Sequence, residues 1–364
     1  MKDRAAQEIE RRKGEHLTLA AGEGVETATP AGWDDIQLVH DALPAIDAAD
    51  VDLSATLLGR ELRLPLLISG MTGGHEGARN VNRILASVAE RSGVAFGVGS
   101  QRAALRDPSL VPTYSIAREA APTAFLIANL GISQLVANGD EPALGRGDIE
   151  RALAMVRADA LAVHLNYLEE SVQPEGQTRA RGAGEALARL IAACPVPVIA
   201  KETGAGITRA VALRLRDLGV KGIDVGGLGG TSFAALEALR AEARGAGRRQ
   251  KLGVRFTEWG VPTAVAVAGS VASGLPVIAT GGVRTGLDAA KALALGATAV
   301  GVARPLLRAA LEGEAAVVEW IAQFELELRT ATFLSGVARS RDLGSAPRVV
   351  LGRTRAWIDQ LGYT

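Results

Sequence analysis

Eight short apolar runs, separated by segments of helical pattern, limit how this chain can fold more than any other feature. The runs are continuous rather than alternating, which is typical of parallel strands covered on both faces. We expect strands at Leu62–Ser69, Val94–Val98, Ala124–Leu130, Ala160–Leu165, Val196–Lys201, Val220–Val225, Leu275–Thr280 and Thr298–Ala303. Helices are expected between them, for example at Asn80–Arg91, Gly147–Arg157, Ala183–Ala193 and Leu287–Leu295. Eight such units predict one closed (β/α)8 TIM barrel of the α/β class; the alternative, a doubly wound open sheet, rarely has so many evenly distributed strands.

The 364 residues divide, in this prediction, into an arm and a barrel. Residues 1–50 precede the first strand and form an N-terminal arm or cap, and residues 51–364 form the barrel. Arg240–Val261 is predicted to be a long exposed connection between the sixth and seventh strands. Ala315–Gly336 is predicted to be a closing pair of helices.

Charge and cysteine content exclude several classes of function. Lys and Arg together number 40, as do Asp and Glu, so no basic field indicates nucleic acid. The single cysteine, Cys194, excludes an internal disulfide and a zinc site built on a cysteine cluster. We interpret it as a small buried apolar residue ahead of a strand.

One long uncharged segment raises the question of a membrane span. Val261–Val283 carries no charge over 23 residues, but small residues dominate it, and Gly274 and Pro276 interrupt it. A helix followed by a buried strand is the better interpretation. The N-terminus is charged and shows no signal peptide, so we expect a cytoplasmic protein without a membrane span.

Polar or glycine-rich residues follow every predicted strand. The densest group is His164–Glu170, which places an imidazole, a carboxamide and two carboxylates directly after an apolar run. Burying such groups without partners is costly, so we expect them to face a site. Barrel enzymes carry their chemistry at the C-terminal ends of the strands.

The turns after the last three strands have the pattern of a phosphate site. They contain Gly229-Gly230-Thr231, Gly281-Gly282 and Ala303-Arg304. Glycine lets backbone N–H groups approach an anion, and a following helix N-terminus adds a favourable dipole. Barrels often bind phosphate after strands seven and eight. Together these turns predict a cofactor that bears a phosphate.

Lys201, at the end of the fifth strand, is a candidate partner for the electron-rich edge of a flavin, because a cation there stabilises negative charge on the reduced ring. The alternative is a salt bridge with Glu202. Ser100 and Asn129 are candidates for the other polar edge of the ring, and capping of the strand ends is the alternative for both.

These residues, in this order, resemble the type 2 isopentenyl-diphosphate isomerases, the flavin-dependent class. The matching segments include Arg11–Leu17, Met71–Gly74, Gly99–Arg102, Ala128–Gly131, His164–Asn166, Gln173–Gly176, Lys201-Glu202, Gly229–Ser232, Trp259-Gly260, Gly281–Arg284 and Ala303–Pro305. The resemblance covers nearly the whole chain. The glycine motifs occur in many flavin barrels, whereas the basic N-terminal motif and His-Leu-Asn are more specific.

The resemblance implies an isomerase that interconverts isopentenyl and dimethylallyl diphosphate in isoprenoid biosynthesis. It implies FMN, active in the reduced form, NADPH as the reductant, and Mg²⁺. The isomerisation is redox-neutral, with a proton added at one carbon and removed at another. The high-energy species has the character of a tertiary cation, which an electron-rich ring stabilises. A homo-oligomer, either tetramer or octamer, is also implied.

Site residues follow from the resemblance position by position. The substrate would be bound by Arg12, Lys13, Ser100, Gln101, Arg102 and Glu169, with the arm contributing to the substrate site. FMN would be lined by Met71, Thr72, Gly73, Ser100, Asn129, Lys201, Thr231, Gly282, Val283, Arg284, Ala303 and Arg304. Glu170 would ligate Mg²⁺, and Glu169, His164 and Asn166 would form the catalytic group. For His164 the alternative is a satisfied core histidine.

Two positions depart from the family pattern. Gly226 stands where Ser or Ala is common, and Glu169 stands where Gln is typical. A carboxylate at residue 169 can titrate and share in proton transfer, bind Mg²⁺ with Glu170, or depress activity through its charge. The remaining alternative is that Glu169 turns away from the site. We expect isomerase activity to be retained with an altered pH profile.

Three other functions compete with this one. Another FMN barrel, such as a 2-hydroxyacid oxidase or dehydrogenase, often needs a histidine late in the chain, yet His16, His40, His75 and His164 all lie in the first half. A purine-nucleotide dehydrogenase needs a nucleophilic cysteine in a mobile loop, and Cys194 lies at the opposite end of a strand. The non-enzyme alternative is a flavin- or prenyl-phosphate-binding homologue that has lost catalysis.

Overall fold

The computed structural model describes residues 14–15, 17–139 and 141–363. Its centre is a closed barrel of eight parallel strands in the order β10-β11-β4-β5-β6-β7-β8-β9. These strands are β4 (Leu66–Ile68), β5 (Ala95–Gly97), β6 (Leu126–Gly131), β7 (Ala160–Leu165), β8 (Val198–Glu202), β9 (Gly222–Asp224), β10 (Val277–Thr280) and β11 (Ala299–Val302). The last strand pairs with the first, with Val300 opposite Leu66, so the sheet is closed. The predicted barrel is therefore confirmed, and the open sheet is excluded.

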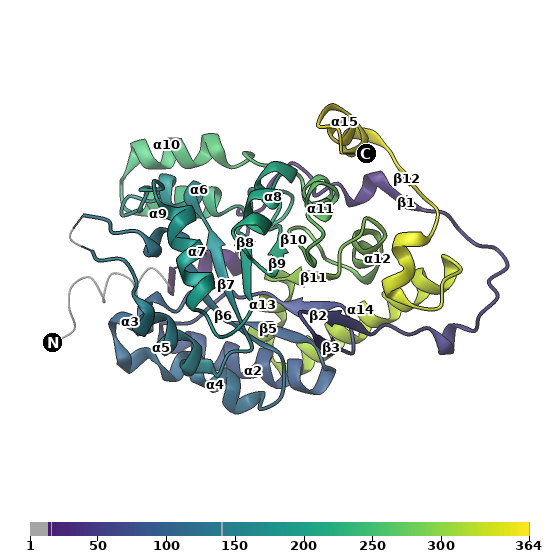
Figure 1. The fold of residues 1–364 in the computed structure, drawn as a ribbon, viewed down its shortest axis with the longest axis horizontal. Coiled ribbons are helices and arrows are strands. Elements are labelled where there is room, and N and C mark those ends of the chain that lie inside the picture. Colours follow the sequence, from purple (N-terminus) through teal and green to yellow (C-terminus); the bar gives the residue numbers. More distant parts are fainter. Residues whose placement is uncertain (1–13, 16, 140, 364) are drawn as a thin grey trace.

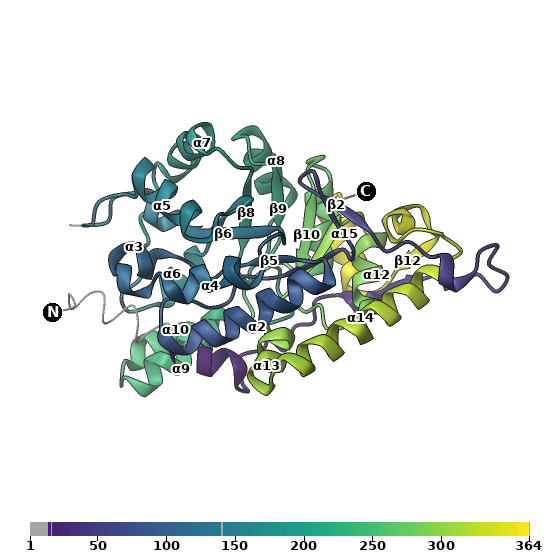
Figure 2. The same ribbon diagram turned by 90° about the horizontal axis from the view of Figure 1, so that it is seen from below.

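Helices surround the barrel, and Figure 1 shows α6, α9 and α10 together at one end. The described helices are α2 (Glu76–Ser92), α3 (Arg102–Arg106), α4 (Pro112–Ala120), α5 (Arg146–Val156), α6 (Tyr167–Val172), α7 (Ala183–Ala193), α8 (Arg209–Asp217), α9 (Phe233–Ala243), α10 (Gly247–Phe256), α11 (Thr263–Val271), α12 (Gly286–Ala294), α13 (Arg304–Glu312), α14 (Glu314–Leu334) and α15 (Gly352–Gln360). In the view from below, α2, α13 and α14 lie along the underside (Figure 2). Within the described residues, no helix combines the length and the apolar character needed to cross a bilayer.

Helix α2 shows how the sequence specifies this outer layer. Its buried residues include Val81, Leu85 and Val88, whose spacing of three or four residues places them on one face of a helix. The helix ends at Gly93, whose φ of 65° is left-handed, a conformation that glycine adopts without a Cβ penalty. Leu85 is fully buried, so truncating it to alanine would cost about 2–5 kcal/mol.

A small hairpin contributes to the core inside the barrel. Strands β2 (Ala55–Leu57) and β3 (Arg60–Leu62) pair in antiparallel register. Leu57 and Leu62 pack in one cluster with inward-facing barrel residues such as Leu67 and Ile127. The first predicted strand therefore began too early, because Leu62 belongs to this hairpin rather than to the barrel.

A further prediction of local structure, the closing pair of helices, was wrong. Ala315–Gly336 contains one long helix, α14, because Val317, Ile321 and Leu328 keep a helical spacing and no Gly or Pro interrupts residues 314–334. Arg240–Val261 does connect the sixth and seventh barrel strands and is largely exposed, as predicted, and the structure adds that it is mostly helical: α9 continues to Ala243, and α10 follows after a short turn. Gly245 supplies the positive φ of that turn.

The N-terminal segment follows the surface of the barrel. Residues 17–21 are helical, and the backbone of Val25 and Thr27 bonds to the loop after β9. Further on, β1 (Ile36–Leu38) pairs with β12 (Arg348–Val350) at the opposite end of the molecule from α9 and α10 (Figure 1).

Candidate active site

A cavity of about 200 Å3 opens at the C-terminal ends of the barrel strands. Every barrel strand contributes at least one lining residue at or just after its end, and the N-terminal segment adds three. The lining includes Leu17, Ala20, Glu26, Ser69, Met71, Ser100, Asn129, His164, Glu169, Lys201, Glu202, Thr231, Phe233, Thr280, Gly282, Val283, Arg284, Ala303, Arg304 and Leu307. The prediction that all eight strand ends face one site is therefore confirmed.

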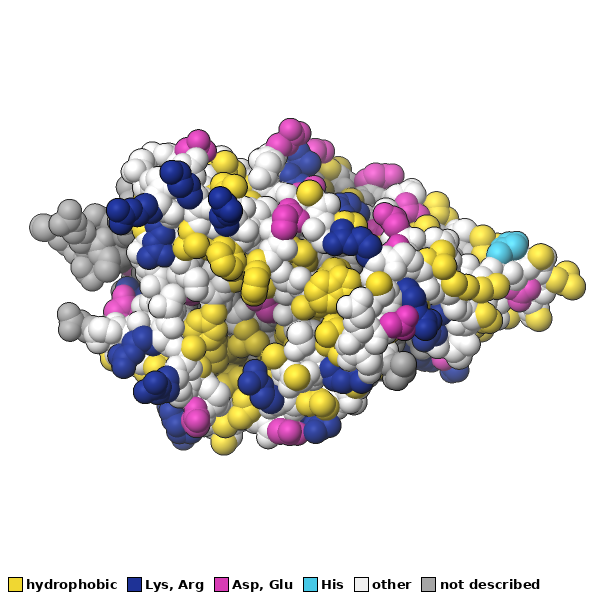
Figure 3. Space-filling model, turned by 90° about the horizontal axis from the view of Figure 1, so that it is seen from above, with side chains coloured by type: hydrophobic (Ala, Val, Ile, Leu, Met, Phe, Trp, Pro, Cys, Tyr) yellow, Lys and Arg dark blue, Asp and Glu magenta, His cyan; other side chains and the backbone are white. Residues whose placement is uncertain are grey.

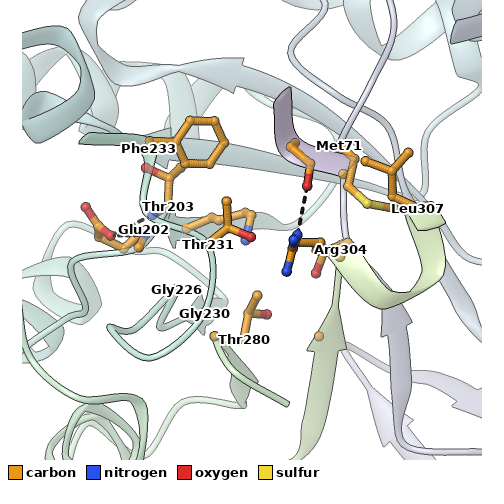
Figure 4. A pocket seen from close by; sticks show the side chains of 18 of the residues that line it. Met71, Glu202, Thr203, Gly226, Gly230, Thr231, Phe233, Thr280, Arg304 and Leu307 are labelled. Carbon is orange, nitrogen blue, oxygen red and sulfur yellow. Dashed lines mark hydrogen bonds between the residues drawn. The ribbon is translucent and has the colours of Figure 1, made fainter. Parts of the chain in front are cut away.

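Each side of this cavity carries both apolar and charged side chains. Met71, Arg304 and Leu307 lie on one side, whereas Phe233 and Glu202 lie on the other (Figure 4). Thr231 lies between the two groups, and a dashed line joins Arg304 to the N-terminal segment. The cavity therefore offers apolar walls together with hydroxyl and charged groups.

The loops after β9 and β10 approach each other with their backbones in contact. A Cβ added to Gly282, whose φ is 65°, would collide with the carbonyl oxygen of Gly229. A Cβ added to Gly230 would lie 2.7 Å from the backbone nitrogen of Gly282. Helix α13 begins directly beyond, at Arg304. Backbone amides and a helix N-terminus thus converge here, which is the arrangement that binds phosphate.

Lys201 lines the cavity and forms a salt bridge with an aspartate that was not among the predicted site residues. Its Nζ lies 2.8 Å from Oδ2 of Asp224, on the neighbouring strand β9. Both side chains are buried, and Oδ1 of Asp224 has no hydrogen-bond partner among the described residues. The alternative of a Lys201–Glu202 salt bridge was therefore wrong, because β8 places consecutive side chains on opposite faces.

Glu202 binds the loop that follows it. Its Oε2 accepts the backbone N–H groups of residues 203–206, at donor–acceptor distances of 2.5–3.2 Å. Burial raises the pKa of Glu202 to about 7, although these four donors favour the carboxylate. The side chain fixes the conformation of the β8–α8 loop at the cavity wall.

Two hydroxyl groups on the cavity floor lack partners. The Oγ of Ser69 and the Oγ1 of Thr280 are buried, and neither has a hydrogen-bond partner among the described residues. Both residues line the cavity. Buried polar groups are normally hydrogen-bonded, so these two indicate a ligand with a polar edge.

His164 is oriented by Asn129. Its Nδ1 lies 2.8 Å from Oδ1 of Asn129, while Nδ2 of Asn129 donates to the carbonyl oxygen of Val98. Because the amide nitrogen is committed to Val98, Nδ1 of His164 is the donor in the other bond. Gln101 completes the arrangement by accepting the backbone N–H of Asn129. His164 is thus both a satisfied buried histidine and part of the cavity wall.

The two carboxylates of α6 are connected through Asn166. Its Nδ2 donates to Glu169 at 3.1 Å and to Glu170 at 3.2 Å. Glu170 is buried and also accepts bonds from Oγ of Ser133 and the backbone N–H of Gln177. Oδ1 of Asn166 is buried without a partner among the described residues.

Four arginines in or near the cavity wall are bound to carboxylates. Arg102 and Arg106 contact Glu141 at 2.6 and 2.5 Å. Burial by itself would raise the pKa of Glu141, but these two arginines lower it to about 2. Arg284 and Arg304 contact Glu26 of the N-terminal segment at 3.1 and 2.9 Å.

The structure brings together most, but not all, of the predicted site residues. Those that line the cavity are Met71, Ser100, Asn129, His164, Glu169, Lys201, Thr231, Gly282, Val283, Arg284, Ala303 and Arg304. Those that lie behind the lining are Thr72, Gly73, Gln101, Arg102, Asn166 and Glu170. Gln101 is fully buried, and its amide donates to the carbonyl oxygen of Ala152. Arg12 and Lys13 lie outside the described residues.

The sequence prediction did not select several residues that organise the site. Asp224 pairs with Lys201, Glu26 binds two arginines, and Phe233 lines the wall. The sequence feature that could have identified Asp224 is its position at the end of a strand, next to the strand that carries Lys201. The pairing of Glu26 with Arg284 and Arg304 joins residues more than 250 positions apart and has no local signal.

The fold and the site define a class of barrel enzymes. Residues 5–349 match the family described as FMN-dependent dehydrogenase. In fold, the chain is similar to a lactate oxidase of Pediococcus acidilactici, with a TM-score of 0.66, 17% identity, and coverage of 95% of this chain and 94% of that one. It is likewise similar to a mandelate oxidase, with a TM-score of 0.62, 20% identity, and coverage of 95% and 100%.

Closer relatives carry a more specific name. The chain is 48% identical over 350 residues to the isopentenyl-diphosphate delta-isomerase of Methanoregula boonei, covering 96% of each chain. It is 46% identical to the enzyme of that name from Methanothermobacter thermautotrophicus, covering 98% of this chain and 97% of that one. The chain belongs to the isopentenyl-diphosphate delta-isomerase family, within the FMN-dependent class, as the sequence resemblance predicted.

Proposed function

We propose that this protein interconverts isopentenyl diphosphate and dimethylallyl diphosphate at the cavity above the barrel. The observation that carries the proposal is the meeting of a glycine-lined phosphate cradle and Glu169 of α6 at one cavity, in a chain that belongs to the isomerase family. The reaction adds a proton at one carbon and removes one at another, so a site with oriented acid–base groups suits it.

The residues fit FMN. Gly282, Ala303 and Arg304 would hold its phosphate, while Ser69, Thr280 and Lys201 would meet the polar edge of its ring. The two hydroxyls without partners and the buried Lys201–Asp224 pair support this placement. Reduced FMN, with NADPH as the proposed reductant, would supply an electron-rich ring and acid–base capacity.

The residues also fit Mg²⁺, provided that the substrate supplies part of its shell. Within the described part of the chain, no group of three His, Cys, Asp or Glu side chains could hold a metal. Glu170 and the unpartnered Oδ1 of Asn166 are oxygen ligands of the kind that Mg²⁺ prefers. They would hold the ion together with diphosphate oxygens and water.

We assign the other side chains as follows. Asn129 holds His164 with its Nδ1–H fixed, so Nε2 is the nitrogen able to bind or release a proton toward the substrate. Glu169 lines the cavity, which supports a role in proton transfer rather than a side chain turned away. Ser100 and Arg102 would contact the diphosphate end, and residues 1–50 would contribute Arg12 and Lys13 to it.

We further propose a homo-oligomer, either a tetramer or an octamer. Hydrophobic side chains gather near the middle of one face of the molecule (Figure 3). Apolar side chains that gather in one exposed patch favour an interface between subunits. Light scattering after size-exclusion chromatography measures the mass.

A 2-hydroxyacid oxidase activity has less support. The likeness to lactate and mandelate oxidases lies below 25% identity and concerns the fold. Of the described histidines, only His164 lines the cavity.

An anaerobic assay tests the proposal. The protein is incubated with FMN, NADPH, Mg²⁺ and isopentenyl diphosphate, and each component is omitted in turn. We expect dimethylallyl diphosphate in the complete mixture and little without Mg²⁺ or reduced flavin. A yellow protein that binds isopentenyl diphosphate without forming product would instead identify a homologue that has lost catalysis.

A further inference from the structure

Helix α9 carries an arginine that joins three separate segments. Nε of Arg240 lies 2.9 Å from Glu15 of the N-terminal arm, and Nη2 lies 3.0 Å from Glu175 of the loop after α6. Nη1 lies 2.5 Å from Glu237, one turn earlier on α9. The Arg240 side chain is 1% exposed, so its guanidinium group is shielded from water. Charge-assisted hydrogen bonds are stronger when they are shielded in this way.

A second arginine, Arg244, repeats the arrangement one turn later. It contacts Glu15 at 3.0 Å and Glu175 at 3.8 Å. The arm and the loop after α6 therefore share the same two guanidinium groups. We call the set of Glu15, Glu175, Glu237, Arg240 and Arg244 the arm clasp.

The arm clasp is connected to the cavity on two sides. Along the arm, Leu17 and Ala20 line the cavity, and the carbonyl oxygen of Ala20 accepts a bond from Arg304 at 2.9 Å. The arm is thus held at Glu15 and again near residue 20, with cavity-lining residues between. On the other side, Nε2 of Gln173 donates to Glu237 at 2.9 Å and to Glu169 at 3.3 Å.

Charge distribution favours reversible docking of the arm. Glu237 is fully buried, so Arg240 is required to balance it. Without Glu15, Arg240 and Arg244 still face Glu175 and Glu237. Release of the arm therefore leaves no buried carboxylate of α9 without an arginine. The Glu15 side chain, 33% exposed, is the most exposed carboxylate of the clasp and therefore the one whose ion pairs can break and re-form.

We propose that Glu15 is a positioning residue, whose ion pairs with Arg240 and Arg244 dock the N-terminal arm so that Leu17 and Ala20 are held at the wall of the proposed substrate site. This inference rests on the proposed isomerase function. It assigns Glu15 no contact with the reacting atoms.

The test compares Glu15→Gln with Glu23→Gln, an exposed glutamate on the same arm, in the full-length holoenzyme. Loss of a charge-assisted pair should raise the KM for isopentenyl diphosphate and the Kd for inorganic diphosphate on the order of tenfold. In Glu15→Gln, the kcat and the amount of bound FMN should stay at the wild-type level. In Glu23→Gln, both KM and kcat should stay at the wild-type level. Arg240 is unsuitable for substitution, because its loss would leave Glu237 buried and unpaired.

Coupling through the shared arginines gives a second measurement. If the arm and the loop after α6 dock as one unit, the double variant Glu15→Gln/Glu175→Gln should raise KM less than the product of the two single effects. Equal KM values for Glu15→Gln and Glu23→Gln would overturn the proposal. A fall in kcat together with loss of FMN would also overturn it, since that pattern indicates a structural role.

A failure of the proposed function is distinguishable from a failure of this inference. Trypsin cleavage after Arg11, Arg12 or Lys13 reports docking without any substrate, and it should be faster in Glu15→Gln than in Glu23→Gln. A wild-type protein that forms no product would sink the isomerase proposal whatever the cleavage rates. An active wild-type protein with equal cleavage rates in the two variants would sink the arm clasp alone.

Discussion

Nζ of Lys201, which lines the cavity, and Oδ2 of Asp224 lie 2.8 Å apart on adjacent strands. Both groups are buried, so each is the main counter-charge of the other in a medium of low dielectric constant. Removing either partner alone leaves an unpaired charge in the barrel.

The double-mutant cycle for this pair has a defined expected result. Lys201→Met should lower the free energy of unfolding by about 3–5 kcal/mol, because it leaves the Asp224 carboxylate unpaired. Adding Asp224→Asn should restore most of that loss without restoring flavin binding. Urea denaturation measures the first effect and flavin absorbance the second. Equal stability of the single and double variants would contradict the pairing.

Glu169 should affect the pH dependence of the reaction. Glu169→Gln removes a titratable group from the cavity wall while keeping an oxygen and the side-chain length. We expect kcat within about tenfold of wild type, and a change in the acidic limb of the kcat/KM profile, since an amide does not titrate. Glu185→Gln, on the exposed face of α7, is the matched control. Superimposable profiles for the wild type and Glu169→Gln would refute the prediction.

Gly282 should tolerate no side chain. Gly282→Ala places a Cβ against the carbonyl oxygen of Gly229 at a positive φ, so we expect a loss of about 1–3 kcal/mol in unfolding free energy and weaker binding of FMN. Gly147→Ala is the control, because no atom lies within 4 Å of the added Cβ and α5 favours alanine. Thermal unfolding with and without FMN distinguishes the two. Unchanged flavin affinity in Gly282→Ala would count against the phosphate cradle.

The ion pairs of Glu141 should make a pH-dependent contribution to stability. Its pKa of about 2 lies below the ordinary value of 4.5, so the contribution is complete above pH 4.5 and is lost as the pH falls toward 2. Glu141→Gln should therefore cost less at pH 4 than at pH 7. The side chain is 39% exposed, so the cost at pH 7 should stay below about 1 kcal/mol. Urea titrations at both pH values, with Glu242→Gln as the control, provide the measurement; a cost independent of pH would be the contrary result.

The barrel and most of its cavity could be predicted because their signals are local. A continuous apolar run such as Ala160–Leu165 indicates a buried parallel strand, and the next few residues must then lie at the rim. The boundary errors occurred where tertiary packing decides the outcome. Leu62 is as apolar as a barrel residue but pairs with Ala55 in the hairpin. Nothing in a short apolar run distinguishes a hairpin strand from a barrel strand.

The parts that could not be predicted depend on long-range pairing. Glu15 and Arg240 are 225 residues apart in sequence. A glutamate and an arginine are ordinary surface residues until the fold brings them together, so composition and spacing give no sign of the arm clasp. The partner of Lys201 was missed for the opposite reason: Glu202 is nearest in sequence, but strand geometry turns it to the other face.

The loop of residues 203–206 has a consequence for the direction in which a cofactor can enter. Its four amides form a concave anion receptor, and that receptor already holds an internal anion, the carboxylate of Glu202. A phosphate group entering from solvent would find these four amides already bonded and would bind on the side of β10 and β11 instead. An elongated molecule with one phosphorylated end would therefore bind in a single orientation in the barrel mouth.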